Sequence, residues 1–158
     1  MTQIHAAAKN VLNASLDQLR EAVERFPDEA TDWNPLPEGN PVGVLVAHAL
    51  AATDFWIGQA SGRPMTFAQY RAERRSPAFA TNNQPTAQLL AMIEATRSEL
   101  GGRLEQATAA DLVVEVVQPE DGAVYGGEEC LLRGLAHLRE HVGHTETMSD
   151  FWRAGIGR

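Results

Sequence analysis

Residues 128–153 read EECLLRGLAHLREHVGHTETMSDFWR, and this stretch predicts a long amphipathic helix. The residues that would share its buried face recur mostly at spacings of three and four: Leu131, Leu135, Leu138, Val142, Thr145 and Trp152. His137 and His141 lie four residues apart, and on a helix this spacing places two imidazole rings one turn apart on the same side. The stretch therefore predicts a packed helix that can bind one metal ion through two histidines.

Three earlier segments show the same helical periodicity. They run from Thr2 to Arg25, from Asn40 and Pro41 to Ser61, and from Pro85 to about Leu104. Asn40 and Pro41 form a favourable N-cap and first helical residue. Residues 33–39 contain too much proline and glycine for regular structure and are expected to form a loop.

The connections between these helices differ in length. Residues 62–84 form a long crossover with a short irregular helix over Phe67–Arg75, which allows the second and third helices to run parallel. Residues 111–118 are rich in β-branched side chains, so we expect a short extended excursion before the last helix and no real sheet. The expected fold is an all-α four-helix bundle, in which sites are built from inward-facing side chains on opposing helices.

Length and composition indicate one domain over residues 1–158, with 44% apolar and 22% charged residues. A net charge of −8 with scattered cations argues against a nucleic-acid or anionic membrane partner. The single cysteine excludes an internal disulfide, and the first residues show no signal peptide. No apolar run approaches the roughly 18 residues that span a bilayer. We therefore expect a cytoplasmic protein whose partner is a small molecule.

A third histidine, His48, lies on the apolar face of the second helix. A neutral imidazole in apolar surroundings needs partners for both nitrogens, and a shared ion supplies one partner each to His48, His137 and His141. Three protein ligands with an open position are typical of a catalytic zinc site, whereas a closed structural site usually contains several cysteines. His144, one turn beyond His141, is either a fourth ligand, a group that supports a ligand, or an exposed residue.

Interpretations without a metal ion remain for each histidine. His48 by itself is compatible with a core histidine that makes one hydrogen bond, and His137 and His141 with a polar helix rim. The pattern His137-x-x-Glu140-His141 also matches the inverted zincin motif, in which the glutamate is the general base. That family takes its third ligand from a carboxylate far downstream, and too little chain follows His141 to provide one.

Neighbouring polar residues have structural interpretations. The helix dipole explains Glu128 and Glu129 in the first turn of the last helix. Cys130 is expected to act as a small buried hydrophobic residue rather than a ligand. His5, near the N-terminus, is expected to have no special role.

Two stretches resemble the DinB/YfiT-like superfamily of bacterial metal-binding four-helix bundles: WNPLPEGNPVGVLVAH over residues 33–48 and HLREHVGH over residues 137–144. The resemblance covers essentially the whole chain. It implies an up-down-down-up bundle, often homodimeric, with zinc or nickel bound by residues matching His48, His137 and His141. Many members read His-Arg-Gly-Gln from the last ligand onward, whereas this chain reads His141-Val142-Gly143-His144, so the Arg and Gln positions differ and the ligand positions are kept.

The resemblance also implies a choice of activities. Some relatives are transferases or isomerases that use a low-molecular-weight thiol, and others have been proposed as hydrolases. A metal with an open position can lower the pKa of a bound thiol or a bound water. Because we see no carboxylate ligand and no obvious general base, the sequence favours a thiol-dependent S-transferase acting on small electrophiles. A metal-dependent hydrolase and a non-catalytic metal-binding or dimerisation module in stress response remain the alternatives.

Aromatic residues gather toward the ends of the second and fourth expected helices: Phe55, Trp56, Phe151 and Trp152. This is more aromatic surface than a small bundle needs for its core. We therefore expect part of it to line a homodimer interface or the mouth of a pocket.

Overall fold

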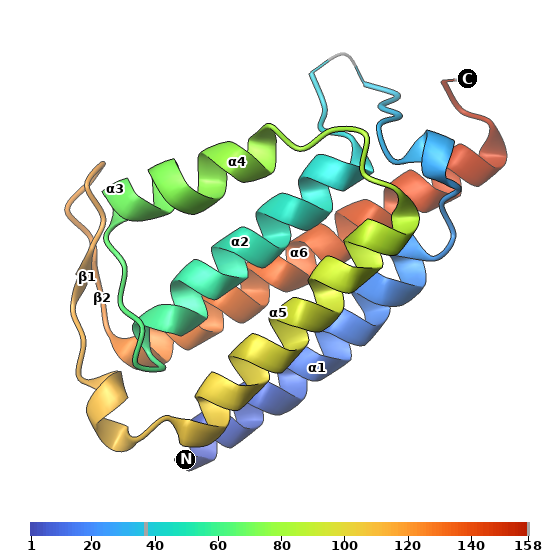
Figure 1. Cartoon of the computed structure of the whole chain (residues 1–158). Helices are drawn as coiled ribbons and strands as arrows, with labels where there is room; N and C mark the ends of the chain where they lie inside the picture. The colour runs from blue at the N-terminus through green and yellow to red at the C-terminus, as the bar shows by residue number, and fades with distance from the viewer. Residues whose placement is uncertain (37, 158) are drawn as a thin grey trace.

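The computed structural model describes residues 1–36 and 38–157. Four long helices form a bundle: α1 (Gln3–Val23), α2 (Val42–Gln59), α5 (Thr86–Gln106) and α6 (Gly127–Ala154) (Figure 1). The expected four-helix bundle is thus confirmed. The loop assignment at Pro37 and the inclusion of Arg158 in the domain lie outside the described residues.

Contacts between helices establish the expected up-down-down-up topology. Arg97 near the middle of α5 binds Asp17 of α1, and Lys9 binds Glu105, so α1 and α5 are antiparallel. Asp54 of α2 pairs with Arg103, and the two helices α2 and α5 run parallel (Figure 1). Gly134, early in α6, lies against Ile57 near the end of α2, so α6 is antiparallel to α2. The long connection between α2 and α5 makes this parallel arrangement possible.

That connection carries a longer helix than expected. It consists of α3 (Phe67–Tyr70), a π-helical turn (Arg71–Arg75) and α4 (Ser76–Phe79). Thr66 and Gln69 form a capping box that begins this helix. Pro77 has no N–H to donate, and its ring would crowd the carbonyl four residues earlier, so a widened turn accommodates the proline and lets the helix continue to Phe79.

The extended excursion is a two-stranded antiparallel hairpin. Strand β1 (Val116–Val117) pairs with β2 (Val124–Tyr125), with Val116 opposite Tyr125. Short 3-10 turns lie at Asp28–Ala30 and Ala109–Leu112. The expected extended excursion is thus present, and among the residues that the structure describes the only sheet is this two-stranded one, where no real sheet was expected.

Some local predictions were wrong. The N-cap of α2 is Pro41 rather than Asn40, and it makes no side-chain capping bond. In the first helix, the helical spacing of apolar residues from Ile4 onward predicts that Val11 is buried, but it is 44% exposed. The helix α5 continues past Gly101 and Gly102 to Gln106, two residues beyond the expected end, because it packs against both α1 and α2. Tertiary packing outweighs the roughly 1 kcal/mol cost of a helical glycine.

The helix α2 is the most buried element of the bundle. By length and composition alone it could cross a membrane, but 72% of it is buried inside the protein. A glycine in α6 allows the two helices to approach closely. A Cβ added at Gly134 of α6 would lie 3.1 Å from the side chains of Ile57 and Trp56 in α2. This close packing brings α2 and α6 together along the stretch that carries the histidines.

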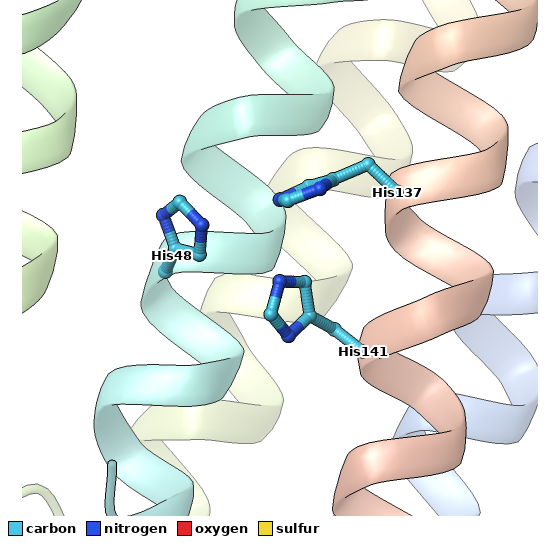
Figure 2. Close-up of side chains that lie close together, drawn as sticks. All are labelled: His48, His137 and His141. Carbon is cyan, nitrogen blue, oxygen red and sulfur yellow. The ribbon is translucent and has the colours of Figure 1, made fainter. Parts of the chain in front are cut away.

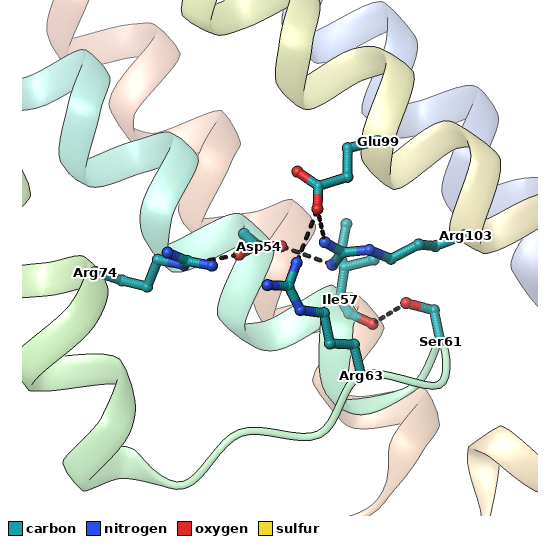
Figure 3. A network of polar contacts seen from close by, with 7 residues as sticks. All are labelled: Asp54, Ile57, Ser61, Arg63, Arg74, Glu99 and Arg103. Carbon is teal, nitrogen blue, oxygen red and sulfur yellow. Dashed lines mark hydrogen bonds and ion pairs between the residues drawn. The ribbon is translucent and has the colours of Figure 1, made fainter.

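An ion-pair network joins α2, the crossover and α5 (Figure 3). Asp54 accepts a hydrogen bond of 2.7 Å from Arg103 and one of 3.3 Å from Arg74. Glu99 pairs with Arg63 at 2.8 Å and also with Arg103. The Asp54 and Arg103 side chains are only 17% and 15% exposed, so this pair is screened less than a surface pair. The network holds the crossover against α2 on the side away from α6.

Candidate metal centre

Three histidine rings meet between α2 and α6. His48 projects from α2, and His137 and His141 project from successive turns of α6 toward it (Figure 2). The ring centroids lie 5.0 Å apart for His48 and His137, 5.1 Å for His48 and His141, and 4.5 Å for His137 and His141. One nitrogen of each ring lies within 4.8 Å of the others. The structure therefore brings together the three residues singled out in the sequence.

The spacing of these nitrogens suits one transition-metal ion. A tetrahedral ion with bonds of about 2.0–2.1 Å to nitrogen holds its ligand nitrogens about 3.4 Å apart. Small side-chain rotations would close the group to that spacing. Nδ1 of His48 and Nε2 of His137 are buried and make no hydrogen bond with any described residue. An orphaned buried nitrogen is costly, and a shared ion would satisfy both nitrogens at once.

The electrostatics keep all three imidazoles neutral at physiological pH. Burial, with a smaller contribution from His137, lowers the pKa of His48 to about 4. Burial and the neighbouring histidines lower the pKa of His141 to about 3. The pKa of His137 is also lowered, mainly by burial. Neutral imidazole is the form that coordinates a metal, so the site is prepared to bind one.

His144 lies beside the cluster but is not a member of it. Its Nδ1 is 3.4 Å from Nδ1 of His141, and its side chain is exposed. This contact uses Nδ1 of His141 and leaves Nε2 on the other side of that ring. A partner on the second nitrogen is the usual way to orient a metal-binding histidine. The geometry thus fits the supporting role that we considered for His144 better than a fourth ligand.

The inverted zincin interpretation does not fit the structure. Glu140 is exposed, and its charge opposes, without reversing, the lowering of the His137 pKa by burial. The third member of the cluster is His48, a histidine from another helix. Within the described residues, the cluster contains no carboxylate.

The other candidate residues are structural. Cys130 is fully buried, and burial raises the pKa of its thiol to about 11, so it is a protonated core residue as expected. Glu128 and Glu129 are exposed in the first turn of α6. His5 is more important than we expected: it is fully buried, its Nε2 donates to the carbonyl of Ala60 at 2.9 Å, and it ties α1 to the end of α2. The sequence signal for this role was its helical spacing from Ala8 and Leu12, which belong to the buried stripe of α1.

The four aromatic residues at the helix ends do not form one surface. Because α2 and α6 are antiparallel, the end of α2 and the end of α6 lie at opposite ends of the bundle (Figure 1). Phe55 and Trp56 pack with Phe67. At the other end, Trp152 packs against Trp33 with ring centroids 5.4 Å apart.

A mostly apolar cavity of about 290 Å³ lies at this second end, and His144, the neighbour of His141, is the histidine that lines it. Its walls include His144, Leu45, Met148 and Phe151. Phe151 is therefore at the mouth of a pocket, which was one of the two roles expected for the aromatic residues. A larger cavity, about 440 Å³, lies beside Arg74 and Asp54 on the side of α2 that faces the crossover and α5, away from the histidines.

The sequence matches the model of the DinB superfamily over residues 12–145. No curated protein sequence matches it. Among solved structures, the chain is similar to YfiT from Bacillus subtilis, described as a probable metal-dependent hydrolase with an unusual four-helix bundle topology. The identity is 18% and the TM-score 0.70, over 98% of this chain and 90% of that one. A conserved protein from Enterococcus faecalis has a TM-score of 0.72 at 13% identity, over 98% and 99% of the two chains.

A mycothiol-dependent maleylpyruvate isomerase is also similar, with a TM-score of 0.65 and 16% identity. The alignment covers 90% of this chain but 62% of the isomerase, so this chain corresponds to only part of that enzyme. At these identities the solved structures establish the fold.

Proposed function

This chain belongs to the DinB superfamily, and from that premise we propose that it is a metal-dependent enzyme with His48, His137 and His141 as ligands of one zinc or nickel ion. The observation that carries the proposal is the pair of buried, unpartnered nitrogens on His48 and His137. They lie on different helices and face the same space as the ring of His141 (Figure 2). Imidazole is a good ligand for both metals.

We further propose a thiol-dependent S-transferase acting on small electrophiles. An ion held by three neutral imidazoles keeps its full positive charge and an open position, which favours a bound thiolate. The cluster contains no carboxylate among the described residues, and a thiol cosubstrate brings its own nucleophile, so less proton transfer is needed from the protein. The similar isomerase is mycothiol-dependent, which supports a low-molecular-weight thiol as cosubstrate.

The residues around the cluster have matching roles in this proposal. His144 orients His141 through the contact between their Nδ1 atoms. The cavity lined by Leu45, Met148 and Phe151 receives the apolar part of the electrophile and excludes water from it. The small-molecule partner therefore approaches from the end of the bundle at which α6 ends.

A metal-dependent hydrolase is the second candidate. The likeness to YfiT, described as a probable metal-dependent hydrolase, covers nearly the full length of both chains. The same open position would then hold a water. The lack of a neighbouring carboxylate base makes this the less favoured reaction. A metal-binding or dimerisation module in stress response, without catalysis, is the third.

We also propose a cytoplasmic homodimer. Val117 and Val124 are opposite each other in the hairpin, and both are more than half exposed. Val113 nearby is 85% exposed. Exposed apolar side chains of this kind favour self-association, which sedimentation velocity at tens of micromolar would detect. A monomer at that concentration would contradict the dimer.

The central experiment measures metal content. We expect about one divalent ion per chain in protein prepared without a histidine tag, and His48→Ala should lose most of it under competition with a chelator. Glu140→Gln, at an exposed residue outside the cluster, is the control and should keep the stoichiometry. Full metal retention in His48→Ala would contradict the three-histidine site.

A conjugation assay separates the functions. Metal-loaded protein should accelerate the displacement of halide from an activated haloarene by a thiol, which releases halide and a proton and leaves a thioether, and His48→Ala should not. Metal binding without turnover for any biological thiol, but with ester hydrolysis, would favour the hydrolase. Metal binding without either activity would favour the non-catalytic module.

A further inference from the structure

The helix over Phe67–Phe79 places two side chains beside the histidine cluster. The Phe79 ring lies against His48, with ring centroids 4.8 Å apart. The Arg75 guanidinium lies over that ring, 4.6 Å from its centroid. The charge of Arg75 is close enough to His48 to contribute to lowering its pKa. Arg75 therefore stands at the rim of the candidate metal centre.

Arg75 differs from the other arginines of its π-helical turn. Arg71 forms an ion pair with Glu120, and Arg74 forms one with Asp54. Arg75 has no carboxylate partner among the residues that the structure describes. Arg75 lies instead over Phe79, whose ring packs against His48. Wide turns of this type occur frequently at functional sites.

The stacking on Phe79 leaves the N–H donors of Arg75 free to bind a ligand. A cation–π contact engages the flat face of the guanidinium, whereas its N–H donors point outward in the plane of the group. That fork of donors matches the two oxygens of a carboxylate. Phe79 thus holds the guanidinium in place without competing for its hydrogen bonds.

The local charge also favours an anion. Three neutral histidines do not offset the charge of a bound divalent ion, and the free guanidinium adds a further positive charge next to it. Two neighbouring cations repel each other unless an anion lies between them. A small molecule that carries a carboxylate would relieve this repulsion.

We propose that Arg75, held by Phe79, is an anchoring subsite for the carboxylate of a small thiol or electrophile that binds at the three-histidine centre. The inference rests on the proposed function, because the centre provides the second point of attachment. It narrows the substrate class to small carboxylic acids. Arg75 would contact the substrate directly, and Phe79 would position Arg75.

The test uses cobalt(II)-loaded protein, whose visible spectrum reports thiol binding without turnover. N-acetylcysteine is titrated against N-acetylcysteine amide, which lacks the negative charge. The acid-to-amide affinity ratio is compared between proteins, so intrinsic differences between the two thiols cancel. We expect Arg75→Ala to lower this ratio about three- to tenfold and to leave the affinity for the amide unchanged. Arg75→Lys should restore part of the ratio, because it keeps the charge and loses the fork.

Arg25→Ala is the matched control, since it removes the same charge from an exposed residue beyond the end of α1. An unchanged ratio in Arg75→Ala, or an equal loss in Arg25→Ala, would overturn the anchoring role and leave the proposed function standing. If cobalt binds but neither thiol alters its spectrum, the thiol-dependent function is wrong. The same titration with acetate and acetamide then decides the role of Arg75 alone. Failure to bind cobalt would overturn both.

Discussion

Lowering the pH from 6.5 to 5 should destabilise the metal-free protein, because two of its histidines resist protonation. The pKa of His48 is lowered to about 4 and that of His141 to about 3, whereas both have the ordinary value of 6.5 in an unfolded chain. At a pH between the native pKa values and 6.5, the histidines of the unfolded chain bind protons that those of the native protein do not. The stabilisation is therefore fully present above pH 6.5 and is lost progressively as the pH falls toward the native pKa values.

The size of the effect follows from the pKa shifts. Each histidine that stays neutral in the native state adds a slope of about 1.4 kcal/mol per pH unit to the free energy of unfolding. Between pH 6.5 and pH 5, two such residues lower the free energy of unfolding by at most about 4 kcal/mol. Because His48 is only half buried, solvent screening reduces our expectation to about 2 kcal/mol. That is a large part of the 5–15 kcal/mol typical of a domain.

The assay is urea unfolding followed by circular dichroism, at pH 7.5, 6.5, 5.5 and 5, with a chelator present. The variant His141→Gln keeps a polar side chain that cannot titrate, so it should lose about half of the pH dependence. The double variant with His48→Gln should lose most of it. Identical pH dependence in the wild type and the double variant would refute the reasoning. With zinc added, the same low pKa values should extend metal retention to a lower pH than unperturbed histidines would allow.

Three further predictions concern stability and are measured by the same unfolding assay. A Cβ at Gly127 would lie 2.6 Å from the backbone of the preceding 3-10 turn, so Gly127→Ala should lower the free energy of unfolding by about 1–3 kcal/mol. Gly126→Ala is the control, because a Cβ there would meet open space, and it should have a much smaller effect. Equal effects of the two variants would contradict the steric argument. Asp54→Ala leaves the largely buried guanidinium of Arg103 with one fewer partner and should cost about 1–2 kcal/mol, and a neutral result would mean that this network does not stabilise the crossover. Gly143→Ala has no neighbour within 4 Å and should stabilise α6 by about 0.5–1 kcal/mol; destabilisation would reveal a close contact that the structure does not contain.

The helices and the histidine group were accessible from the sequence because both depend on local periodicity. Leu138 and its stripe determine which side of α6 is buried, and the spacing of His137 and His141 determines that they share a side. The convergence of His48 with them was an inference from apolar surroundings. The structure shows the convergence directly, through nitrogens within 4.8 Å of one another.

Other features depend on relations between distant segments. The sequence does not reveal that His5 donates to Ala60, or that Arg75 stands beside His48, because each pair belongs to different helices and their register is set by packing. Part of the aromatic surface at the helix ends was expected to line a dimer interface or a pocket mouth, and the sequence does not reveal that the antiparallel direction of α2 and α6 divides these residues between opposite ends of the bundle. Direction and register arise from the connections and from the shapes of the packed faces, which periodicity does not encode.

The sequence by itself therefore determined four amphipathic helices and a pair of metal-ligand candidates, since a stripe of side chains is a property of one helix. Only the tertiary structure decided, among the described residues, that Nδ1 of His48 and Nε2 of His137 lack partners, that Arg75 lies over Phe79 without a carboxylate partner, and where the cavity lined by His144 opens. Those properties arise where two or more elements meet. Their free energies depend on burial and on distances of a few ångströms, and the order of residues along one helix specifies neither.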